Sequence, residues 1–112
     1  MRYFEDILSL QVKNIRNLVN EAKETQITIT VASTPVIERF VERLESILSY
    51  VKKFELYHIF MPGEICRYKV LSDLEYLKNH IETKYTYREG TFAYKTMNSI
   101  LDVINETMEE IK

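Results

Sequence analysis

One cysteine and two histidines are the residues of this sequence best suited to covalent or metal chemistry. Cys66 lies eight residues after His58 and fourteen residues before His80. With Glu64 or Asp73 these residues could supply enough ligands for a metal ion, but their separations match none of the standard zinc motifs. We therefore expect no metal site.

Cys66 could instead act as a nucleophile with a histidine as its base, because such pairs meet in space rather than in sequence. Catalysis would also need a loop that stabilises developing negative charge. The chain has only two glycines, which leaves little material for an oxyanion loop or a phosphate-binding loop. The sequence therefore predicts that Cys66 is a small buried residue, and that the protein is not an enzyme and has no cofactor.

The segment KYTYREGTFAYK, residues 84–95, is the second candidate site. It contains four aromatic side chains, three cations and one glutamate, and so has a local net charge of +2. Exposed rings beside cations are typical of proteins that bind single-stranded nucleic acid, where each base stacked on a ring contributes about 1–3 kcal/mol. On this hypothesis the binding residues are Tyr85, Tyr87, Arg88, Phe92 and Lys95. Arg67 and Lys69 would enlarge the site if the fold brought them close.

The same rings could instead complete the hydrophobic core while the cations face water, a role that suits tyrosine because its hydroxyl can reach solvent. The whole chain gives no support for a strong positive field, since its 15 basic and 17 acidic residues leave a net charge of -2. We favour the core interpretation, and keep single-stranded DNA or RNA binding as the alternative function.

The first predicted helix extends from Tyr3 to Glu24, where apolar residues recur every three or four positions with an interruption at Gln11. From Ile27 to Val31, apolar residues alternate with threonines at a period of two, and these β-branched residues favour a short extended segment. The alternative is a first helix that continues to the break at Pro35.

The second predicted helix has the clearest apolar face in the chain. Ser33 and Thr34 can cap its amides, Pro35 suits its first position, and it should end before Pro62. Part of its apolar face follows the three- and four-residue steps of a short heptad pattern. Like charges four residues apart on its other side, such as Arg39 and Arg43, also favour a partner. We predict a homodimer interface formed by Ile37, Phe40, Val41, Leu44, Leu48 and Val51.

A third helix carries the apolar stripe of Val70, Leu74, Leu77 and Ile81, but its start is ambiguous. Ser72 with Glu75 matches a capping box, which would make residues 65–71 a strand or loop, whereas a start near Pro62 would make them helical. A last helix follows residues 84–95. That segment is either a small β-hairpin or, as we favour, a turn in which Thr91 caps the last helix.

Together these patterns predict a single domain over residues 1–112 that is mainly α, with about four amphipathic helices in a bundle. The leading functional hypothesis is a non-enzymatic interaction protein that forms a homodimer through helix faces. No stretch approaches the ~20 apolar residues of a membrane span, and the acidic residues near the start do not suit a signal peptide. We therefore expect a soluble cytoplasmic protein, in keeping with its single cysteine.

Overall fold

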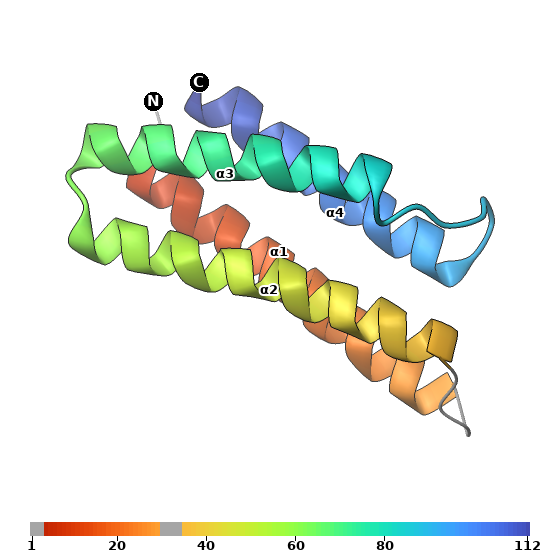
Figure 1. Ribbon diagram of the computed structural model, residues 1–112. Helices are drawn as coiled ribbons and strands as arrows, with labels where there is room; N and C mark the ends of the chain where they lie inside the picture. Colours follow the sequence, from red (N-terminus) through yellow and green to blue (C-terminus); the bar gives the residue numbers. More distant parts are fainter. Residues whose placement is uncertain (1–3, 30–34) are drawn as a thin grey trace.

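The computed structural model describes residues 4–29 and 35–112 and forms four helices within them: α1 (Phe4–Ile29), α2 (Pro35–Phe60), α3 (Gly63–Thr83) and α4 (Phe92–Ile111). Successive helices are antiparallel, and the molecule is elongated, measuring 46 × 23 × 21 Å (Figure 1). The mainly α, four-helix prediction is confirmed. No β-strand occurs in the described part of the chain.

The four helices form two layers, with α2 beside α3 and α1 beside α4 (Figure 1). α1 packs against both α2 and α4, and α3 packs against the same two helices, so one core runs along the bundle. The side chains most deeply buried in this core come from all four helices: Ile15, Val19, Leu44, Ile47, Val51, Phe54, Val70, Leu74, Leu77, Ile81, Ile100 and Ile104.

The first helix is longer than its apolar pattern suggested. α1 continues through Ile27, Thr28 and Ile29, so the predicted extended segment is wrong for these residues, and Thr30 and Val31 lie outside the described residues. β-branched residues disfavour a helix by only a few tenths of a kcal/mol each, which an established helix tolerates because each added residue also gains a hydrogen bond. Gln11 does not break the stripe, since it is buried and its side-chain oxygen accepts a hydrogen bond from Asn14 at 2.9 Å.

Proline fixes both ends of the second helix. α2 begins at Pro35, as predicted, and ends at Phe60, two residues before Pro62. The proposed capping residues, Ser33 and Thr34, lie outside the described residues. α2 thus supplies the long packing helix that its apolar face indicated.

The third helix begins at Gly63, directly after Pro62, and the capping box at Ser72 is not its start. Residues 65–71 are therefore helical, and the strand or loop interpretation is wrong. The earlier start is explained by the periodicity of burial: Cys66 and Val70 are buried on the same stripe as Leu74. A helix over 65–71 gains this extra apolar burial, which outweighs a local cap.

Residues 84–91 connect α3 to α4 without forming a hairpin, so the β-hairpin alternative is wrong. Thr91 caps α4 as predicted, because its hydroxyl oxygen accepts a hydrogen bond from the Tyr94 amide at 3.2 Å. The same hydroxyl donates to the Arg88 carbonyl at 2.7 Å. Gly90, between them, has a φ of 88°, a conformation that costs glycine little. The turn therefore closes on itself and starts the helix instead of pairing strands.

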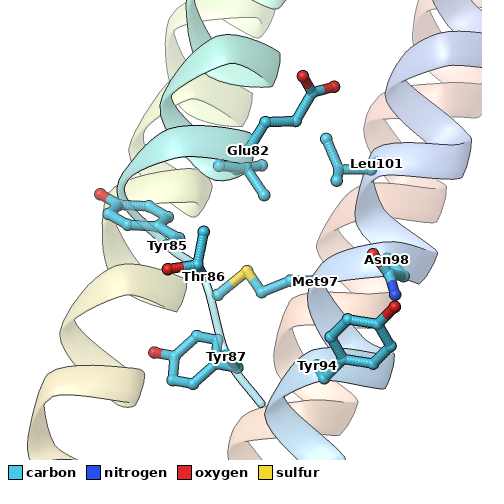
Figure 2. A pocket seen from close by; sticks show the side chains of 9 residues that line it. Glu82, Tyr85, Thr86, Tyr87, Tyr94, Met97, Asn98 and Leu101 are labelled. Atoms are coloured by element: carbon cyan, nitrogen blue, oxygen red, sulfur yellow. The ribbon is translucent and has the colours of Figure 1, made fainter. Parts of the chain in front are cut away.

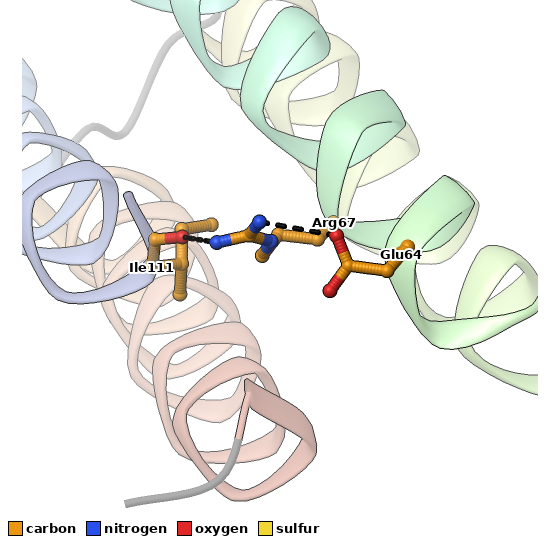
Figure 3. A network of polar contacts seen from close by, with 3 residues as sticks. All are labelled: Glu64, Arg67 and Ile111. Atoms are coloured by element: carbon orange, nitrogen blue, oxygen red, sulfur yellow. Dashed lines mark hydrogen bonds and ion pairs between the residues drawn. The ribbon is translucent and has the colours of Figure 1, made fainter.

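Polar contacts hold the helices in register at the surface. Ion pairs join α1 to α2 between Arg16 and Glu55 and between Lys23 and Glu45. Arg67 joins α3 to the end of α4, since its guanidinium donates to the Ile111 carbonyl at 3.3 Å and pairs with Glu64 at 3.1 Å (Figure 3). A cation at the last carbonyls of a helix is also favoured by the helix dipole.

Candidate functional site

The residues proposed to bind nucleic acid do not form one surface. Tyr85 and Tyr87 are half-buried and line a cavity between α3, the connection and α4. Phe92 and Lys95 line a different cavity, between α1 and α4, and Arg88 is exposed. α4 separates these two cavities, so a strand of nucleic acid would have to bend around this helix to touch all five side chains.

Two of the proposed stacking rings already have partners within the chain. The guanidinium carbon of Arg43 lies 5.2 Å from the ring centre of Tyr85 and 5.2 Å from that of Tyr87. Phe40 meets the Tyr87 ring edge to face at 5.6 Å, and His80 meets the Tyr85 ring at 4.8 Å. We call Phe40, Arg43, His80, Tyr85 and Tyr87 the Arg43 cluster. Cation–π and edge-to-face contacts stabilise this arrangement, so these rings are engaged in tertiary packing.

The Arg43 cluster lies where α2 and α3 diverge. The two helices are closest at their short connection and separate toward the start of α2 (Figure 1). Rings meet across this space, since Tyr50 of α2 lies 6.4 Å from Tyr76 of α3, and Tyr76 stacks on His80 of its own helix at 5.9 Å. Long aromatic side chains reach across a gap between helices that shorter aliphatic side chains do not span.

Arg67 and Lys69, the two cations considered as an extension of the nucleic-acid site, lie elsewhere. Arg67 contacts Glu64 and the end of α4, near the start of α3. Lys69 pairs with Asp73 at 3.5 Å and lies 5.9 Å from the Tyr57 ring centre. Both are on the first turns of α3, whereas residues 84–95 follow its last turn, so they do not extend that segment.

The predicted dimer interface on α2 faces the chain's own core. Phe40, Leu44 and Val51 are buried within the bundle, and Ile37, Val41 and Leu48 are half-buried. A side chain that already packs inside its own subunit has no surface left for a partner. Any self-association therefore needs apolar side chains other than Phe40, Leu44 and Val51.

Exposed apolar side chains gather instead around the short α2–α3 connection. Phe60 is 77% exposed, Tyr68 71%, Ile59 68%, Ile65 58% and Leu56 53%. We call these five residues the apolar end. The sequence alone did not establish this surface, because the same apolar residues could equally have belonged to the core. One pattern does indicate it: Leu56 and Phe60 are both apolar and lie four residues apart, so they share the side of α2 opposite the core residue Phe54.

A groove lies next to the apolar end, between the first half of α1 and the last turns of α2. It has a volume of about 230 Å³, and Leu8, Val12 and Phe54 are its apolar lining. Ile59 lines it too, and Ser9, Glu55 and His58 form its polar lining. Ile59 is the member of the apolar end that borders the groove, because Leu56 and Phe60 lie on the opposite side of α2 from Phe54.

The residues considered for catalysis and metal binding are dispersed. Cys66 is buried, and its burial together with the nearby Glu5 carboxylate raises the pKa of its thiol above the ordinary value of 9.0. The thiol is therefore protonated at neutral pH, when a nucleophile would need to be a thiolate. His58 is exposed at the groove, and His80 belongs to the Arg43 cluster. Within residues 4–29 and 35–112, no three His, Cys, Asp or Glu side chains are grouped to hold a metal ion.

Two tyrosines between α2 and α3 have perturbed acidity. Burial raises the pKa of Tyr57 first, and its hydrogen bond to Asp73, at 2.9 Å, adds to the effect. Burial also raises the pKa of Tyr50, with contributions from Tyr76 and Asp73. In both cases the phenol stays neutral at physiological pH, so these shifts reflect packing between α2 and α3 and do not supply a general base.

Comparisons with family models, curated proteins and solved structures find no match to this chain. None of the helices in the described ranges combines the length and apolar character needed to cross a membrane. Function must therefore be argued from the surface of the bundle itself.

Proposed function

We propose that this chain is a non-enzymatic interaction protein that forms a homodimer through its apolar end. The observation that carries the proposal is the concentration of exposed apolar side chains at Leu56, Ile59, Phe60, Ile65 and Tyr68. Exposing such side chains to water is unfavourable, and a contiguous apolar patch on a folded chain commonly marks an interaction surface.

The area of the apolar end suits a dimer interface. With about 200 Å² for each large side chain, the exposed fractions of these five residues correspond to roughly 600 Å² of apolar surface. This is at the upper end for the largest patch on a typical monomer, about 300–600 Å². A stable interface buries about 800 Å² on each partner, so the apolar end would supply most of this area.

The shape of the surface favours a second copy of the chain as the partner. Ile59 is 68% exposed at the edge of the groove, whose lining combines the apolar Leu8, Val12 and Phe54 with the polar Ser9, Glu55 and His58. In a two-fold dimer each residue pair is made twice, so the Ile59 side chain of each copy can occupy the groove of the other. A protrusion and a hollow on one surface are self-complementary, which a patch of protrusions alone is not.

Light scattering at micromolar concentration tests the proposal. The chain has a mass of 13.4 kDa, so a dimer should give about 27 kDa. Replacing Phe60 with aspartate buries a charge in the interface and should weaken the dimer by roughly 30-fold or more, as expected for a central contact. The control is Leu10→Asp, another exposed apolar residue, 43% exposed on α1, which should leave the dimer unchanged.

A second variant tests the reciprocal fit. Ser9 is exposed at the edge of the groove, and Ser9→Arg should obstruct it and weaken the dimer even though Phe60 is intact. A monomer at every concentration, or a dimer that survives Phe60→Asp, would overturn the proposal. If Phe60→Asp dissociates the dimer but Ser9→Arg does not, the Ile59 side chain does not occupy the groove.

A further inference from the structure

We propose that the cavity between α3, the α3–α4 connection and α4 binds a small organic cation that carries an alkylated ammonium group. The cavity has a volume of about 220 Å³ (Figure 2). It lies away from the apolar end, at the opposite end of α3, so this inference does not depend on the dimer. Its principal lining residues are Glu82, Tyr85, Tyr87, Tyr94, Met97 and Asn98.

Three tyrosine rings line this cavity, and a phenol ring attracts a cation placed over its face. Tyr85 and Tyr87 are held by Arg43, which belongs to α2, a helix that contributes no residue to the cavity lining. Their positions are therefore fixed before any ligand arrives, but Arg43 already uses part of their attraction for cations. Tyr94 makes no ring contact with the described residues, which leaves its ring available to a ligand.

The polar groups of the cavity also suit a cation. Glu82 is the one charged residue in the lining, and its carboxylate forms no ion pair with the rest of residues 4–29 and 35–112. The Asn98 amide and the Tyr94 hydroxyl are likewise free of hydrogen bonds to the described residues. Lys84 and Arg88 neighbour the lining residues in sequence but do not line the cavity. A cavity with apolar walls and a few converging unpaired polar groups is typical of ligand sites.

The cavity on the other side of α4 shows why charge decides the ligand class. That cavity is of similar size, about 250 Å³, but its lining includes both Glu21 and Lys95 and only one aromatic residue, Phe92. Opposite charges give it no preference for a cation or an anion. In the tyrosine-lined cavity, by contrast, Glu82 is the one charged lining residue, and Arg43 lies against Tyr85 and Tyr87 but not against Tyr94. The Glu82 carboxylate and the Tyr94 ring are therefore the groups that attract a cation with an apolar surface.

Binding of choline tests the inference. Its control is the neutral isostere in which carbon replaces the quaternary nitrogen, so that the two probes share their shape and differ in charge. We expect choline to bind with a Kd of about 1 mM or tighter, and to shift the NMR signals of the Asn98 side-chain amide and the Met97 methyl group. The neutral isostere should bind roughly tenfold more weakly.

Variants distinguish this site from nonspecific attraction of a cation to an acidic protein. Glu82→Gln should weaken choline binding roughly tenfold, whereas Glu75→Gln, two turns earlier on α3 and also exposed, should leave the Kd unchanged. Tyr94→Leu, with its fold checked by circular dichroism, should weaken binding as well. The inference is overturned if choline does not saturate the site, if both probes bind equally, or if Glu82→Gln has no more effect than Glu75→Gln.

Discussion

The two ends of the α2–α3 pair both carry aromatic and basic side chains, but they expose them differently. At the connection between these helices, Phe60 and Tyr68 project into solvent. At the far end, Tyr85 and Tyr87 are half-buried and enclose the Arg43 guanidinium. Composition alone therefore does not decide whether an aromatic residue serves the core or the surface.

The spacing of the helices explains this difference. Near the connection the Tyr57 side chain reaches from α2 to α3, since its hydroxyl donates a hydrogen bond to Asp73 at 2.9 Å. Phe60 and Tyr68 lie outside this contact and are exposed. At the far end the helices diverge, and rings from the α3–α4 connection fill the space (Figure 1). The long α3–α4 connection thus supplies interior rings, Tyr85 and Tyr87, whereas the short α2–α3 connection supplies none.

The largest expected effect comes from removing one ring at each end. Phe40→Ala should lower the free energy of unfolding by about 3–5 kcal/mol, because this buried ring contacts both Tyr87 and Phe92. Phe60→Ala should change the stability of the monomer by less than about 0.5 kcal/mol, because the ring is exposed. Urea denaturation at a concentration low enough to keep the chain monomeric measures both. Similar losses at the two positions would remove the distinction between the two ends.

A smaller effect is expected for the cation of the Arg43 cluster. Arg43→Met keeps much of the side-chain length but loses the charge over two rings, and should cost about 1–2 kcal/mol. Arg39→Met, at an exposed position one turn earlier on α2, is the matched control and should cost less than about 0.5 kcal/mol. Thermal unfolding followed by circular dichroism compares the two. Equal costs would mean that Tyr85 and Tyr87 are held by packing alone.

The smallest expected effect is the difference in the free energy of unfolding between removing the Tyr57 hydroxyl and removing the Tyr87 hydroxyl. Tyr57→Phe removes a hydrogen bond to Asp73 and should cost about 1 kcal/mol. The Tyr87 hydroxyl is buried without a hydrogen-bond partner among the described residues, so Tyr87→Phe should leave stability unchanged or increase it slightly. Paired urea denaturation curves provide the measurement. A clear loss of stability in Tyr87→Phe would show that this hydroxyl has a partner, such as a bound water.

Much of the fold follows from signals within single helices. Pro35 starts α2, and Thr91 caps α4, as their residue types predict. Local signals failed where they competed with a longer pattern: Ser72 resembles a cap, but Cys66 and Val70 extend the buried stripe of α3 past it. The alternation at Ile27 and Ile29 likewise yields to a helix that is already formed. Which pattern prevails depends on the burial that neighbouring segments provide, and a local sequence pattern carries no information about that burial.

The candidate sites were less predictable, because burial depends on neighbouring helices. Ile37 to Val51 and Leu56 to Phe60 follow similar apolar spacing on one helix, yet Phe40 and Leu44 are covered while Phe60 is not. The rings at residues 84–95 could be identified from sequence, but their partner, Arg43, lies on another helix more than 40 residues away. The tyrosine-lined cavity depends on α3, α4 and their connection together, so no single segment indicates it.

The packing of α1 against both α2 and α4 has a consequence for synthesis of the chain. A ribosome completes α1 first and α4 last, so one apolar flank of α1 has no partner until all the other helices have been made. Buried α4 residues such as Ile104 and Met108 emerge only at that stage. We therefore expect α1 to stay only partly packed during synthesis, and the bundle to reach its final form once α4 has emerged.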